Sequence, residues 1–143
     1  MGTISKNFSY SEFEYSDTAK KHNIINIIDT TEKRDAIKDL VLEVLQPLRD
    51  ALDEPLKINS GYRCAELNTY VGGQPSSQHL KGEACDVAAK DPLALSQKAY
   101  DLRLPYDQMI VYPTFVHFSH KLKGVQRKQV LYNSSYKGAK IKL

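Results

Sequence analysis

Three residues with metal-binding side chains, His79, Asp86 and His117, are the chemically most informative part of the sequence. Asp86 lies between alanines in the stretch 84–88, which is typical of a half-buried strand, where a carboxylate is costly unless a positive group faces it. Two histidines and one carboxylate can bind zinc and leave a coordination position open for water, as catalytic sites do. From the spacing alone a second interpretation stays open, in which Asp86 pairs with Arg63 and both histidines are ordinary hydrogen-bonded residues.

These residues must be positioned by a framework that the apolar pattern predicts. A helix should begin near Thr30 or Thr31, because six apolar residues follow at helical spacing: Ile37, Leu40, Val41, Val44, Leu45 and Leu48. Pro47 should kink this helix or end its regular hydrogen bonding. Shorter helices are predicted over 65–70 and over about 92–102, the second of them starting with a capping aspartate and a proline.

Strands are predicted mainly in the second half of the chain. Five stretches have the composition of short strands: 56–59, 84–88, 108–112, 115–119 and 129–132. Because side chains alternate along a strand, His117 should face away from Val116 and Phe118, which point into the core. Helices come first and strands later, without regular alternation, which predicts an α+β fold with a small antiparallel sheet and helices packed on it. Residues 1–143 should form one domain, with a basic and mobile end at about 133–143.

Composition and charge narrow the classes of function. The 143 residues are 41% hydrophobic and 26% charged, as in an ordinary globular protein. No apolar run is long enough to span a membrane and no signal peptide is present, so we expect synthesis in the cytoplasm. Residues 108–143 hold seven basic and no acidic side chains. Their spacing matches no nucleic-acid-binding module, so we expect a solvated basic face and no nucleic-acid partner.

The remaining cysteines and histidines give no further site. Cys64 and Cys85 form neither a disulfide framework nor a cysteine-based zinc motif, so we predict two buried, reduced thiols. His22 and His120 show no pattern of partners, and we predict that both lie at the surface.

A larger pattern emerges when the motifs are taken in order. The central motifs are Ser60-Gly61-Tyr62-Arg63, Leu67-Asn68, Val71-Gly72-Gly73 and Ser77-Gln78-His79 with Gly82, Ala84 and Asp86. Upstream lie the Phe8 to Asn26 segment and Val44 to Arg49, and downstream lie Tyr106 to Ile110 and Val116 to Ser119. This ordered set resembles the zinc-dependent D-alanyl-D-alanine carboxypeptidases and endolysin peptidases, above all their small carboxypeptidase-like branch from bacteria, phages and prophages. The resemblance covers almost the whole chain and implies a DD-peptidase-like fold of the hedgehog type.

The resemblance also implies roles for individual residues. The zinc ligands of the family, for one zinc ion per chain, fall on His79, Asp86 and His117. The family's arginine falls on Arg63, where it would orient a carbonyl or carboxylate of the substrate. Ser77 and Gln78 would support the loop and the contacts around His79.

In one respect the sequence departs from the family. The family usually supplies a Glu or Asp a few residues before the second histidine, and here Tyr112 lies about where that acid is expected, with Phe115 in place of a tryptophan. A tyrosine can donate a hydrogen bond to an oxyanion, but with a pKa of about 10 it is a poor base at neutral pH. Asp107 is the nearest upstream acid, and a role in capping or bracing its loop is a better interpretation of it than catalysis.

The function implied by the resemblance is zinc-dependent hydrolysis of amide bonds in peptidoglycan stem peptides or crosslinks. The enzyme would be a D,D-carboxypeptidase or an endopeptidase that reaches the cell wall only if it is released or exported, as a phage-encoded protein would be. The missing carboxylate keeps an alternative open: a catalytically lapsed module of the same fold that binds cell-wall peptide or serves as a phage structural component. We expect no membrane insertion, and the sequence makes no prediction about the oligomeric state.

Overall fold

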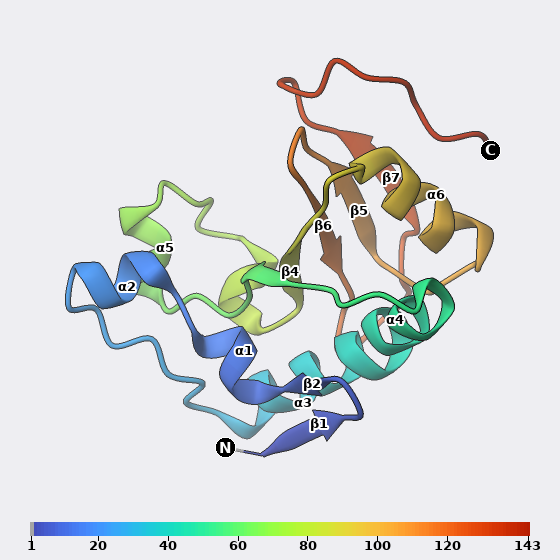
Figure 1. Cartoon of the computed structure of the whole chain (residues 1–143). Coiled ribbons are helices and arrows are strands. Elements are labelled where there is room, and N and C mark those ends of the chain that lie inside the picture. The colour runs from blue at the N-terminus through green and yellow to red at the C-terminus, as the bar shows by residue number, and fades with distance from the viewer. Residues whose placement is uncertain (1) are drawn as a thin grey trace.

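A five-stranded sheet forms the centre of the computed structural model, which describes residues 2–143 (Figure 1). In the spatial order β3-β4-β6-β5-β7 the strands span Ile58–Ser60, Ala84–Ala88, Phe115–Ser119, Gln108–Val111 and Gln129–Tyr132. The first four are antiparallel neighbours, which confirms the predicted α+β class with a small antiparallel sheet. β7 adds a parallel edge strand beside β5, a pairing that the sequence did not predict.

The register between β4 and β6 determines which side chains share a face of the sheet. Asp86 pairs directly with His117. The residues on either side of this pair are fully buried and form the core face: Cys85, Val87, Val116 and Phe118. Because successive side chains point to opposite faces, Asp86 and His117 project together from the other face.

Helices cover the core face. α3 (Thr31–Leu40), a π-helical turn (Val41–Leu45) and α4 (Gln46–Leu52) follow one another and bury their apolar stripe in the same cluster as the core face of the sheet. α6 (Pro92–Asp101) adds Leu95 and Ala99 to that cluster. In Figure 1, α4 and α6 are seen to the right of β4. Among residues 2–143, none of these helices has the length and apolar character needed to cross a bilayer.

The region around Pro47 shows the predicted interruption of regular helical hydrogen bonding. The helix begins after its N-cap Thr30, as predicted, but it continues through Pro47 to Leu52. Its hydrogen bonding changes just before the proline: Val41–Leu45 is π-helical, and the N–H of Gln46 donates to the carbonyl at the start of that turn. Since proline lacks an N–H and crowds the preceding turn, the wider turn accommodates it without ending the helix.

Residues 2–30 form short elements, and the two helices among them are capped by Ser9 and Ser16. The elements are β1 (Thr3–Ser5), β2 (Phe8–Ser9), α1 (Tyr10–Glu14) and α2 (Asp17–Lys21). α5 spans Ala65–Tyr70 as predicted, and in Figure 1 it lies with α2 to the left of β4. β3 is shifted from the predicted strand 56–59 and includes Ser60, because Ser60 pairs with Asp86.

The prediction that His120 lies at the surface is wrong. Only 8% of the surface of His120 is exposed. Its backbone N–H donates to the carbonyl oxygen of Glu83, which extends the pairing of β4 with β6 by one step. His22 is exposed as predicted. Cys64 and Cys85 are both free thiols, but Cys85 is fully buried and Cys64 only half-buried.

The C-terminal segment 133–143, predicted to be mobile, makes specific contacts near its end. Ile141 is buried in the main core cluster, and its N–H donates to the hydroxyl of Tyr132. Lys142 exchanges two backbone hydrogen bonds with the side chain of Gln97 in α6. These contacts attach the end of the chain to the α6 side of the sheet.

Candidate metal centre

The three predicted metal-binding side chains converge on the face of the sheet opposite the core. One donor atom from each of His79, Asp86 and His117 lies within 4.8 Å of the other two. The Oδ1 atom of Asp86 is 2.9 Å from Nδ1 of His117 and 3.4 Å from Nε2 of His79. β4 and β6 provide Asp86 and His117 through their direct pairing, and His79 comes from a 3-10 turn, Gln78–Lys81.

The orientation of the His79 ring is set by hydrogen bonds from its own turn and from a neighbouring loop. Ser77 Oγ accepts a hydrogen bond from the backbone N–H of His79 at 3.2 Å, a contact that fits the supporting role implied for Ser77. Nδ1 of His79 lies 2.7 Å from the carbonyl oxygen of Gly61, so this nitrogen carries the proton and donates it. Nε2 therefore keeps its lone pair on the side of Asp86, as a metal ligand requires.

Gly61 permits this contact because a loop and a helix approach closely there. A Cβ atom at position 61 would lie 2.7 Å from Cα and 2.8 Å from the carbonyl oxygen of Phe13 in α1. Backbone atoms cannot yield to a side chain in the way that a flexible side chain can. Glycine is therefore required where the carbonyl group faces His79.

The ionisation of Asp86 and His79 suits metal binding. Burial raises the pKa of the Asp86 carboxyl, but its polar contacts with the His117 and His79 imidazoles outweigh this effect and hold the pKa well below its usual range. Burial lowers the pKa of His79, although Asp86 acts in the opposite direction. Asp86 is therefore an ionised carboxylate and His79 a neutral imidazole, which are the forms that bind a metal ion.

The donor set fits zinc. Zinc binds histidine nitrogen and carboxylate oxygen, and its catalytic sites combine three protein ligands with one open position. Calcium and magnesium sites are built almost wholly from oxygen ligands, and two imidazoles do not match them. His79, Asp86 and His117 could therefore hold a zinc ion between β4, β6 and the 3-10 turn.

Beside the three donors, Asn26 clamps the backbone on both sides of Arg63. The Nδ2 atom of Asn26 donates to the carbonyl oxygens of Tyr62 and Glu14, each at 2.9 Å. Its Oδ1 atom accepts the N–H of Cys64 at 2.7 Å. Asn26 belongs to the upstream motif, but the sequence alone assigned it no role, because nothing local indicates a partner 36 to 38 residues away.

The Arg63 guanidinium is available to a ligand. Its Nε atom is buried without a hydrogen-bond partner among residues 2–143, and the described chain places no carboxylate oxygen within 4.0 Å of it. The interpretation in which Arg63 is ion-paired with Asp86 is therefore not supported. Burial lowers the pKa of Arg63, while Asp86 acts to raise it. A guanidinium remains protonated under such shifts, so it can donate to a carbonyl or carboxylate oxygen.

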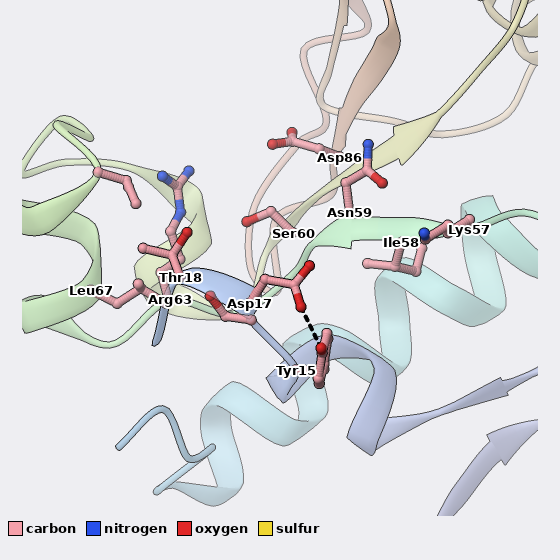
Figure 2. Close-up of a pocket in the computed structure, with 12 residues that line it drawn as sticks. Tyr15, Asp17, Thr18, Lys57, Ile58, Asn59, Ser60, Arg63, Leu67 and Asp86 are labelled. Carbon is pink, nitrogen blue, oxygen red and sulfur yellow. Dashed lines mark hydrogen bonds between the residues drawn. The ribbon is translucent and has the colours of Figure 1, made fainter. Parts of the chain in front are cut away.

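Two cavities meet at this site. The first has a volume of about 590 Å³ and the second about 660 Å³, and both are lined by Arg63, Val71 and Asp86. Figure 2 shows the first cavity, where the Asp17 carboxylate lies between Arg63 and β3 and is hydrogen-bonded by the Tyr15 hydroxyl. The ligand set therefore has open space on two sides.

Asp107 braces a loop, as the sequence interpretation preferred. Its side chain is fully buried and forms a two-point ion pair with Arg127, with Nη2 to Oδ2 at 2.7 Å and Nε to Oδ1 at 3.0 Å. Gln78 also donates to Asp107 Oδ2 at 3.2 Å, which ties the brace to the turn that carries His79. Asp107 lines neither cavity, which argues against a catalytic role. Arg127 was not identified from the sequence, where it is one of several scattered basic residues.

Tyr112 lines the second cavity together with Arg63 and the three metal-binding side chains. Its ring stacks on Phe115, with centroids 4.1 Å apart. Burial, followed by the charge of Asp86, raises the pKa of the Tyr112 hydroxyl, so it stays protonated and acts as a donor at neutral pH. Within the described part of the chain, Asp17 is the one carboxylate that lines either cavity besides Asp86.

Comparison with known proteins agrees with this geometry. The sequence profile of the family described as peptidase M15 matches residues 6–119. The chain belongs to the peptidase M15 family. The matched region contains Arg63 and all three predicted metal ligands, and it ends with β6. A known relative, the zinc D-Ala-D-Ala carboxypeptidase of Streptomyces albus G, is 41% identical over 46 residues, which are 32% of this M15 chain and 18% of that protein. The match thus spans less than a fifth of that relative.

Proposed function

We propose that this M15 protein is a zinc-dependent peptidase that hydrolyses amide bonds in bacterial cell-wall peptides. The supporting observation is that two imidazoles, one carboxylate and one unpaired guanidinium meet at the junction of two cavities. The name of the Streptomyces relative, a zinc D-Ala-D-Ala carboxypeptidase, supports a D-alanyl peptide as substrate. Space on both sides of the ligand set suits a peptide that extends in two directions from the bond that is cut.

Each residue of the site has a defined task in this proposal. His79, Asp86 and His117 would hold the zinc ion. A zinc ion bound there supplies Lewis acidity, which polarises a carbonyl group and makes a water molecule more acidic. The Arg63 guanidinium binds the carbonyl oxygen of the scissile amide and stabilises the negative charge that develops on it. The protonated Tyr112 hydroxyl donates its hydrogen bond to that oxygen or to the leaving nitrogen.

The proposal is tested with metal-loaded protein and purified peptidoglycan. We expect about one zinc ion per chain by elemental analysis, together with release of new amino groups or D-alanine between about pH 6 and about pH 9. His79→Ala should lose both zinc and hydrolysis. His22→Ala is the matched control, because His22 is exposed and lines neither of the two cavities at the ligand set. Zinc-saturated protein that releases neither product, and behaves like His79→Ala, would refute the peptidase function.

A second candidate function rests on Tyr112. The carboxylate that moves protons in related enzymes is replaced by this tyrosine, so the protein is alternatively a catalytically lapsed module that binds cell-wall peptide or forms part of a phage particle. Tyr112→Glu separates the two ideas. A gain of hydrolysis would indicate a lapsed site, whereas loss of existing hydrolysis in Tyr112→Glu and in Tyr112→Phe would indicate that the hydroxyl takes part.

A further inference from the structure

We infer that Arg127 forms a second binding site for a carboxylate group of the peptide, in the larger cavity beside the metal centre. Arg127 lies in the segment between β6 and β7, outside the region 6–119 that matches the family profile. Arg127 lines the same cavity of about 660 Å³ as Arg63, His79 and His117. The inference rests on the proposed function, because it names a feature of the peptide that the site would bind.

The guanidinium of Arg127 is held in place before any ligand arrives. Asp107 accepts hydrogen bonds from Nη2 and Nε of Arg127 and also from its backbone N–H, at 2.7, 3.0 and 2.8 Å. The Asp107 side chain is fully buried, whereas that of Arg127 is 43% exposed. One edge of the planar group is therefore fixed against the protein, and its remaining N–H groups are free to donate. A guanidinium that is already held in one orientation binds a carboxylate at a smaller entropic cost than a mobile side chain does.

The charges around the two cavities indicate which part of a peptide each would accept. Within the described chain, the only carboxylate that lines the larger cavity is Asp86, which faces the two histidines, while Arg63 and Arg127 are its two permanent cations. The smaller cavity is lined by Lys57 and Asp17 as well as Arg63 and Asp86, so its formal charges cancel. The lining of the larger cavity has two cations and one carboxylate, and Asp107 pairs with one edge of Arg127 from outside that cavity. A negatively charged group is therefore favoured in the larger cavity.

Two groups of a cell-wall peptide have this chemistry: its C-terminal carboxylate and the side-chain carboxylate of an acidic residue. The test uses three versions of one acetylated peptide that contains Glu and ends in D-Ala-D-Ala, namely the free acid, its C-terminal amide and its Glu-to-Gln version. The kcat/KM for each peptide is measured with the zinc-loaded protein and with its Arg127→Lys variant. Lysine keeps the positive charge but cannot donate two parallel hydrogen bonds as a guanidinium does. We expect the unmodified protein to prefer the free acid over one of the two neutralised peptides by about tenfold to a hundredfold, and Arg127→Lys to lose most of that preference.

If Arg127→Lys has no effect on the kcat/KM of one of the two neutralised peptides, the carboxylate that is missing from that peptide is the one that Arg127 binds. If the substitution lowers kcat/KM for all three peptides by the same factor, Arg127 serves only to brace Asp107 and the inference is wrong. Lys123→Gln, which removes one exposed charge from the same segment, should leave all the ratios unchanged. The free energy of unfolding of each variant, measured in urea, shows whether the loss of hydrogen bonds to the buried Asp107 has destabilised the fold.

Failure of the proposed function gives a different result. If no version of the peptide is hydrolysed, the same three peptides are titrated calorimetrically into the zinc-loaded protein. A preference for carboxylate that depends on Arg127 would then support this site in a protein that binds peptide without cutting it. Equal affinities for all three peptides would overturn it.

Discussion

Replacement of Asn26 by alanine should destabilise the protein and displace Arg63 at the same time. The amide of Asn26 makes three hydrogen bonds to the backbone, at 2.9, 2.9 and 2.7 Å, and two of them hold the residues immediately before and after Arg63. Each such bond contributes about 0.5–1.5 kcal/mol net, and a donor left unpaired in a partly buried place costs more. Because Asn26 is only half-buried, we expect Asn26→Ala to lower the free energy of unfolding by about 2–4 kcal/mol.

The assay compares two substitutions at this position. Asn26→Asp keeps an oxygen for the N–H of Cys64 but turns a carboxylate oxygen toward the carbonyl groups of Tyr62 and Glu14, so we expect it to destabilise at least as much as alanine. Urea unfolding is followed in zinc-free protein, because metal binding would otherwise add to the measured stability. The kcat/KM of the zinc-loaded variants should fall by at least about tenfold, because misplacement of an orienting group is costly.

A neighbouring residue provides the control. Ile25 is 76% exposed, and Ile25→Ala should change the free energy of unfolding by less than about 0.5 kcal/mol. If both substitutions at Asn26 were as mild as this control, the three hydrogen bonds would not hold the Arg63 segment. If stability fell but kcat/KM per folded, zinc-loaded molecule did not, the clamp would support the fold without positioning the guanidinium.

Three further substitutions test the core, the metal centre and the brace. Leu45→Ala should lower the free energy of unfolding by about 2–5 kcal/mol in urea, since Leu45 is fully buried in the π-helical turn. Gly61→Ala should weaken zinc binding by about tenfold to a hundredfold in a chelator competition assay, because the clash with Phe13 displaces the carbonyl that orients His79. Burial raises the pKa of Asp107, but the hydrogen bonds from Arg127 outweigh this effect and lower the pKa overall. The ionised Asp107 therefore stabilises the fold above about pH 4, and this stabilisation is lost as the pH falls further. The difference in the free energy of unfolding between the unmodified protein and Asp107→Asn should therefore stay constant from about pH 7 to about pH 5 and shrink as the pH falls below about 4.

Each of these substitutions has a control of the same residue type. Leu42 is 44% exposed in the same π-helical turn, and Leu42→Ala should cost much less than Leu45→Ala. Gly2 has no atom within 4 Å of an added Cβ, so Gly2→Ala should bind zinc normally. Asp35 is exposed, and Asp35→Asn should leave the pH dependence of stability unchanged. Equal effects in a substitution and its control would contradict the corresponding argument.

The parts of the fold that local patterns determine were predictable from the sequence. The apolar stripe over Ile37–Leu48, the cap at Thr30 and the alternation in β6 each carry their own signal, and α5 and β6 have the predicted bounds. The parallel pairing of β7 with β5 carries no such signal, because it depends on the path of the connecting segment. The π-helical form of the turn before Pro47 likewise carries no local signal. It allows the helix to accommodate the proline while the apolar stripe stays buried on both sides of it.

The ligand set was predictable for a different reason. His79, Asp86 and His117 are far apart in the chain, and only the order of the surrounding motifs predicted that they would meet. The contacts behind them were not predictable in this way. Gly61 lies within one of those motifs, but neither the contact of its carbonyl oxygen with His79 nor the pairing of Arg127 with Asp107 follows from a pattern in the sequence.

The arrangement of the site separates metal binding from proton transfer. The ligands are positioned by the pairing of β4 with β6, by the Gly61 carbonyl and by the contact between Gln78 and Asp107, and none of these involves Tyr112. A change of residue type at position 112 can therefore alter the chemistry while the three donors stay in place. This explains how a chain could keep the proposed ligand set and yet lack the carboxylate expected at position 112. It also makes zinc content and hydrolysis independent measurements for this protein, so the presence of one cannot be taken as proof of the other.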